Sequence, residues 1–243
     1  MSSASSVESF APLLIVPATV LSYILGWAIG LPVLVPLLNT LAGFPFMYAA
    51  LKRGDVGRAI LRMLLWALVM GVCATVLSYV QPARTDALFL RGRSYRVEMF
   101  DWIRTGIGAE SDPSRFIPEH AAHLFVFAWV AVATGGILAL AMGAVLMNYM
   151  GHYVGALAAA SARPIETMAL AWHPWAVIRI ASFVTIGVVL SGPVLSRVGG
   201  FRFEWRSHRR LLGYAAAGLL IDVVLKWLLA PSWHGLLFHV VGW

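Results

Sequence analysis

Apolar residues dominate this chain, and the longest uninterrupted apolar stretch has no Asp, Glu, Lys or Arg between residues 124 and 162. A transmembrane helix needs about 20 mostly apolar residues, so this stretch is long enough for more than one bilayer crossing. The pattern predicts one long central helix over residues 120–162. That helix either continues well beyond the bilayer or breaks near Gly135 and Gly136 or near Gly151.

Small residues recur at every fourth position of this stretch, in two sets: Ala131, Gly135, Ala139 and Gly143, then Gly151, Gly155 and Ala159. Small residues at this spacing let helix backbones approach closely in lipid. We therefore expect the two sets to be packing faces, directed at different neighbours because a four-residue step drifts around a helix of 3.6 residues per turn.

Residues 10–51 are apolar but interrupted by prolines. They predict either one span followed by an interfacial segment or two spans that meet near Gly30 and Pro32. Further spans are expected at residues 60–80, 177–195 and 211–229, with an interfacial tail over residues 232–243. The total is five spans, or six if the first stretch or the central stretch is divided.

Residues 81–119 form the one long polar segment. Within it, residues 94–108 place Arg96, Phe100, Ile103 and Ile107 three or four positions apart, and Met99 extends the apolar face. This spacing predicts an amphipathic helix lying in the membrane interface, although a helix that docks on a partner would show the same pattern.

The composition agrees with the pattern, because 60% of the residues are apolar and 12% are charged, against about 25% charged in soluble domains. We therefore predict an all-α polytopic helical bundle forming a single membrane domain over residues 1–243, in a bacterial cytoplasmic membrane. The net charge of +7 suggests contact with anionic lipid headgroups and no nucleic-acid partner.

Much of that positive charge lies in one loop between predicted spans, at Arg197, Arg202, Arg206, Arg209 and Arg210, which alternate with aromatic residues. We expect these arginines to face anionic headgroups, with the aromatic side chains dipping into the interface. With five spans, this loop and residues 81–119 lie on one side, which favours a cytoplasmic location for both. One extra crossing within the central stretch would remove that argument.

Two ionisable residues lie inside the last predicted span, Asp222 and Lys226, four positions apart. Charges in a membrane helix are costly and often functional. We favour a structural interpretation in which the two side chains neutralise each other along one helix face. A proton or ion relay is the alternative.

A second polar group, near the end of the central stretch, comprises Asn148, Tyr149, His152 and Tyr153. Hydrogen bonds between helices explain such residues, and a substrate or quinone site is the alternative. A third group, Glu119, His120 and His123, has ligand types that suit a metal. Its order differs from the His-Glu-x-x-His motif of zinc proteases, and a cluster at the start of a helix is the simpler interpretation.

No phosphate-binding loop, CxxC pair or nucleophile elbow is present in the sequence. We therefore expect no catalytic activity and no cofactor. The leading hypothesis is a non-catalytic membrane subunit that anchors or scaffolds a larger assembly, with other membrane proteins or copies of itself as partners. The alternative is a small permease or channel-like transporter, with a polar route lined by Asp222, Lys226, Asn148 and His152. A haem- or quinone-binding electron-transfer subunit ranks third.

Overall fold

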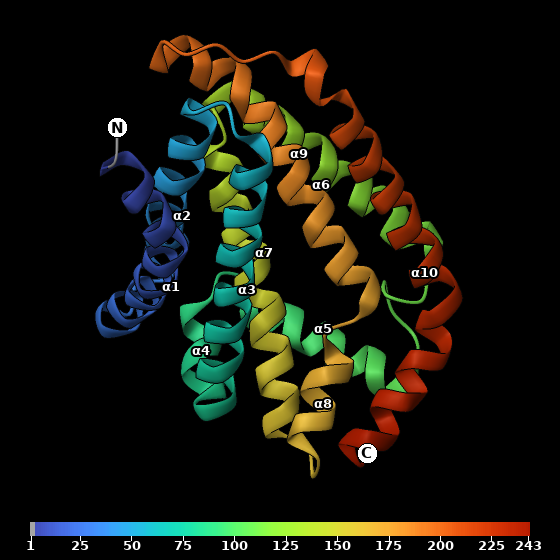
Figure 1. Cartoon of the computed structure of the whole chain (residues 1–243). Helices are drawn as coiled ribbons and strands as arrows, with labels where there is room; N and C mark the ends of the chain where they lie inside the picture. Colours follow the sequence, from blue (N-terminus) through green and yellow to red (C-terminus); the bar gives the residue numbers. More distant parts are fainter. Residues whose placement is uncertain (1–2) are drawn as a thin grey trace.

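The chain is an all-α bundle in the computed structural model, which describes the backbone from residue 3 and side chains from residue 13 (Figure 1). The elements are α1 (Ser3–Ile29), α2 (Leu34–Lys52), α3 (Val56–Val80), α4 (Pro82–Leu88), α5 (Gly92–Thr105), α6 (Pro113–Thr134), α7 (Ile137–Ala159), α8 (Pro164–Ala171), α9 (Pro174–Gly199), the 3₁₀ turn η1 (Trp205–His208) and α10 (Arg209–Val241). Among the described residues, six helical segments are long and apolar enough to cross a membrane, and α1 adds a shorter apolar segment, Leu13–Ile29. The predicted fold class is confirmed.

The proline-rich start of the chain forms two helices, α1 and α2. Gly30 takes a positive φ of 75°, which ends α1, and the short turn through Pro32 leads into α2. The two helices pack side by side. Of the two arrangements open from the sequence, the structure has the hairpin.

The central stretch is also two helices, so the prediction of one long helix over residues 120–162 is wrong. Gly135 and Gly136 have φ values of 59° and 88°, a left-handed conformation that glycine adopts at low cost. Two such residues in succession reverse the chain between α6 and α7. This is one of the two break points that the sequence allowed.

Because the central stretch is divided into α6 and α7, three long helices, α6, α7 and α9, separate the two arginine-rich segments, which lie at opposite ends of the bundle. Figure 1 shows α5 across the lower end and the loop between α9 and α10 at the upper end. The balance of Lys and Arg therefore no longer favours either orientation, and the argument that residues 81–119 are cytoplasmic falls.

The second set of small residues forms a close helix contact, as expected. A side chain at Gly151 would strike Ala74, and one at Gly155 would strike the carbonyl oxygen of Thr75. These glycines let α7 approach α3 closely, and the two helices share the most extensive contact in the bundle.

The predicted amphipathic helix is α5, but its apolar face is covered by protein. Met99, Phe100 and Ile103 are buried in a core shared with α7, α8 and α10. Ile107 follows the helix end at Gly106 and is exposed, so its place on the apolar face was predicted wrongly.

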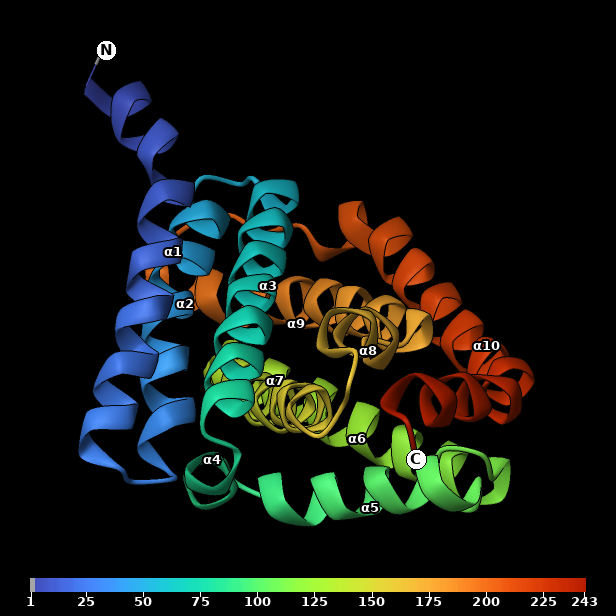
Figure 2. The same ribbon diagram turned by 90° about the horizontal axis from the view of Figure 1, so that it is seen from below.

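The predicted interfacial tail over residues 232–243 is not a separate helix. It continues α10 through Pro231 to Val241 and turns back beneath the bundle towards α5 (Figure 2). There Trp243 packs against the ring of Phe100 and the guanidinium of Arg104.

Candidate functional site

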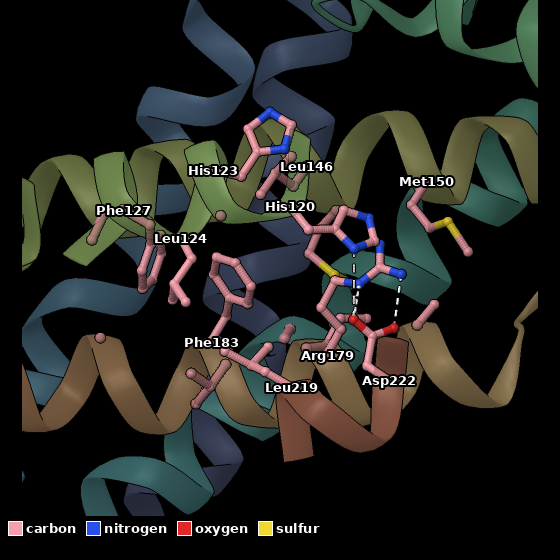
Figure 3. Close-up of a pocket in the computed structure, with 18 of the residues that line it drawn as sticks. His120, His123, Leu124, Phe127, Leu146, Met150, Arg179, Phe183, Leu219 and Asp222 are labelled. Atoms are coloured by element: carbon pink, nitrogen blue, oxygen red, sulfur yellow. Dashed lines mark hydrogen bonds and ion pairs between the residues drawn. The ribbon is translucent and has the colours of Figure 1, made fainter. Parts of the chain in front are cut away.

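A cavity of about 600 Å³ lies among the helices of the bundle, lined by residues of α2, α3, α5, α6, α7, α9 and α10 and of the loop between α5 and α6. Most of its wall is apolar and includes Phe127 and Phe183, whereas Arg179 and Asp222 face each other on another part of the wall (Figure 3). A pocket of this size and mixed lining is typical of sites for small molecules.

The first ion pair of the cavity joins α9 and α10. Arg179 donates from Nε and Nη2 to the two carboxylate oxygens of Asp222, at 2.9 and 2.8 Å. The side chain of Asp222 is 2% exposed and that of Arg179 is 25% exposed. Two parallel charge-assisted bonds hold the carboxylate in a fixed orientation.

The second ion pair joins α10 to the loop between α5 and α6. Lys226 Nζ donates to Glu110 Oε1 at 2.8 Å and lies 4.6 Å from the ring centroid of Phe116. Burial would raise the pKa of Glu110, but the charges of Lys226 and Arg179 lower it to about 2, so Glu110 is ionised at neutral pH.

These contacts correct the predicted pairing of Asp222 with Lys226. The two residues share a face of α10, as their spacing requires, and both line the cavity. Each binds an opposite charge from another element, however, so α10 does not neutralise its own charges. Asp222 and Lys226 therefore tie three separate segments together around the cavity.

Glu119, His120 and His123 all line the cavity, but they do not form the metal site considered from the sequence. Within the described part of the chain, no three His, Cys, Asp or Glu side chains are placed to hold a metal ion. His120 points towards Asp222, with Nδ1 3.9 Å from Oδ2, while His123 points away (Figure 3). Nδ1 of His120 is buried and has no hydrogen-bond partner among the described residues.

The predicted polar group near the end of α7 lies on two different faces of that helix, with Asn148 and His152 on one face and Tyr149 and Tyr153 on the other. Asn148 donates to Asn39 Oδ1 on α2 at 3.0 Å and accepts from the hydroxyl of Tyr23 on α1. Asn39 in turn donates to Ser22 at 2.7 Å. For Asn148 the structure thus has the predicted hydrogen bonds between helices, and Asn148 does not line the cavity.

His152, on the same face as Asn148, lies between Ser78 of α3 at 2.9 Å and Asp86 of α4 at 2.8 Å. Arg96 of α5 binds Asp86 through two hydrogen bonds of 2.9 and 2.7 Å, and the pKa of Asp86 is lowered because its bonds to Arg96 and His152 outweigh the effect of burial.

This Ser-His-Asp set is not arranged for catalysis. Ser78 is fully buried, and Nδ1 of His152 faces the serine, whereas Nε2 does so in hydrolase triads. The contacts instead fasten α3, α4, α5 and α7 together. His152 is outside the cavity lining, so a route through Asn148 and His152 to Asp222 and Lys226 is not present.

The other face of α7 carries the two tyrosines. Tyr149 lines the cavity with Tyr95, and their ring centroids are 4.4 Å apart. Tyr153 is fully buried beneath Tyr95, and its hydroxyl finds no partner among the described residues.

The arginine-rich loop is exposed at all five predicted positions, Arg197, Arg202, Arg206, Arg209 and Arg210. Its phenylalanines do not dip into the interface as predicted. Phe201 packs against Tyr48 of α2, and Phe203 lies over Gly192 of α9. Trp205 is exposed and free to contact lipid, whereas Phe201 and Phe203 are half-buried.

Sequence reasoning missed Arg179 and Glu110 as site residues. Arg179 lies near the start of the predicted span over residues 177–195, and Glu110 lies in the polar segment. The one available signal was charge: two buried charges on α10 required two partners among the ionisable residues near span ends.

The arrangement of apolar helices defines an α-helical integral membrane protein. The chain matches no protein-family model, and no curated protein or solved structure shows significant similarity to it. Any assignment beyond this class must come from the site itself.

Proposed function

We propose that this protein binds a small amphipathic molecule in the cavity and carries it into or across the bilayer. The observation that supports this proposal is the cavity itself: about 600 Å³ inside a bundle of apolar helices, with apolar walls and two buried ion pairs at one end. Apolar walls suit a hydrocarbon chain, and the charged end suits a polar head group.

The ion pairs favour binding over a purely structural role. Buried ion pairs often contribute little net stability, because desolvation offsets their attraction. In a membrane protein such residues are functional candidates by default. Here all four charged side chains line the same cavity.

The scaffold hypothesis loses most of the features that supported it. The glycines of α7 contact α3 of the same chain, Ala131 and Ala139 are buried in its own core, and the apolar face of α5 is covered by α7 and α10. These surfaces are therefore used within the monomer and are not available to partners.

The cavity can be filled without disturbing the packing. Gly143 of α7 lines it, and an added Cβ there has no neighbour within 4 Å. Gly143→Leu should therefore place a side chain in the cavity. Gly213→Leu is the matched control, because Gly213 is also helical, exposed and without neighbours within 4 Å, but lies outside the cavity.

The test is native mass spectrometry of the purified protein, followed by solvent extraction of the small molecules that it retains. The wild type and Gly213→Leu should retain the same amphipathic compound, and Gly143→Leu should lose it while eluting as the same species. Equal retention by all three proteins, or no retained compound in any of them, would count against the proposal.

A further inference from the structure

The charged end of the cavity has no buried cation available to an anionic ligand. Two of the bonds that Arg179 makes go to Asp222, and Lys226 is bound to Glu110. The third cation of the lining, Arg91, is exposed. At the buried pairs, an anionic head group would have to displace a carboxylate. Leaving that carboxylate buried without its counter-charge is costly.

Carboxylates, by contrast, are available. Glu98 of α5 and Glu119 of α6 line the cavity and are exposed, and the structure records no ion pair for either among the described residues. The lining carries four carboxylates, those of Glu98, Glu110, Glu119 and Asp222, and three cations, those of Arg91, Arg179 and Lys226. With neutral histidines, its net charge is therefore −1.

The carboxylates are close enough to influence one another. The pKa of Glu98 is raised, first by partial burial and then by the charges of Glu119 and Glu110, against weaker opposition from Arg115 and Arg91. Mutual repulsion of this kind is relieved when a positive charge enters.

Two further features suit a cationic nitrogen. The rings of Tyr95 and Tyr149 line the cavity together, and aromatic faces attract cations. Nδ1 of His120 is buried near Asp222 without a hydrogen-bond partner among the described residues. In the neutral tautomer with the proton on Nε2, it would accept a hydrogen bond from an N–H group.

We propose that the cavity selects organic cations, specifically a protonated amine carried on an apolar chain. The amine lies near Glu98 and Glu119, and the chain extends along the apolar wall towards Phe127 and Phe183. This inference rests on the proposed function and specifies the charge of its substrate.

The test compares three ligands that share a ten-carbon chain and differ in the head group: decylammonium, decanoate and decanol. Binding to the full-length protein is measured in nanodiscs of zwitterionic lipid, with subtraction of the signal from empty nanodiscs. Decylammonium should bind at least about tenfold more tightly than either of the other two, which corresponds to about 1.4 kcal/mol.

The variant Glu98→Gln/Glu119→Gln should lose about tenfold in affinity for decylammonium and leave decanol binding unchanged. The matched control is Glu166→Gln/Glu204→Gln, which removes two exposed carboxylates outside the cavity lining and should bind like the wild type. An equal loss in both variants would show a general charge effect and overturn the assignment.

The two proposals fail in different ways. If decanoate or decanol binds best, and Gly143→Leu abolishes that binding, the cavity is a ligand site but the charge assignment is wrong. If none of the three ligands binds above the empty nanodiscs, the cation inference fails. If in addition Gly143→Leu retains the same compounds as the wild type, the proposed function fails as well.

Discussion

The pairing of Asp222 with Arg179 can be tested against the pairing that the sequence suggests. Asp222 is 2% exposed and receives two hydrogen bonds from Arg179. Removing one partner of a buried ion pair costs about 3–5 kcal/mol. Asp222→Asn should therefore lower the free energy of unfolding by about 3 kcal/mol, and much of that cost should disappear when Arg179→Met is added.

Two double-mutant cycles separate the alternatives. The cycle of Asp222→Asn with Arg179→Met should give a coupling energy of about 2–3 kcal/mol, at the upper end for residues in contact. The cycle of Asp222→Asn with Lys226→Met should give about 0.5 kcal/mol or less, the size of a helical pair four residues apart.

The assay is reversible unfolding in mixed micelles, with helical circular dichroism and elution volume to confirm that each variant folds. A coupling energy between Asp222 and Lys226 that equals or exceeds the one between Asp222 and Arg179 would refute the arrangement described here. It would restore the view that α10 neutralises its own charges.

Three further predictions concern regions outside the cavity. The pKa of Asp86 is lowered in the folded protein, so its ionised carboxylate stabilises the fold above the pKa of an unfolded aspartate, about 3.9. Thermal stability should therefore fall as the pH drops below about 4. Asp86→Asn should reduce this pH dependence, measured as melting temperature over a series of pH values. Gly155→Ala should lower the melting temperature strongly, because its Cβ meets the carbonyl oxygen of Thr75, whereas Gly143→Ala should not; equal melting temperatures would contradict the close contact of α3 and α7. The five exposed loop arginines are Arg197, Arg202, Arg206, Arg209 and Arg210. Replacing them with Gln should reduce the anionic lipid retained in native mass spectrometry, because each arginine contributes about 1 kcal/mol of attraction to anionic lipid. Unchanged retention would exclude this loop as the lipid contact.

Local patterns in the sequence predicted much of the fold. The expected spans over residues 60–80, 177–195 and 211–229 lie within α3, α9 and α10. Hydrophobicity over about 20 residues determines such helices, and it can be measured without knowledge of the neighbours. Glycines at four-residue spacing likewise predicted the close contact of α7.

The turns and the pairing of charges could not be predicted in the same way. Whether Gly135 and Gly136 break a helix depends on their backbone conformation and on the packing of the turn against Ser191 and Leu195 of α9. The partner of Lys226 is 116 positions away in the sequence. Spacing along a helix shows which residues share a face, but it cannot show what that face meets.

The turn at Gly135 and Gly136 also has a consequence for biogenesis. With no polar loop between them, α6 and α7 must enter the bilayer together as a helical hairpin. Had the chain continued as one helix, every later segment would emerge on the other side of the membrane, including the arginine-rich loop and the C-terminus. Two adjacent glycines thus set the topology of the final third of the protein, and a substitution that straightens this turn would invert that part of the chain during insertion.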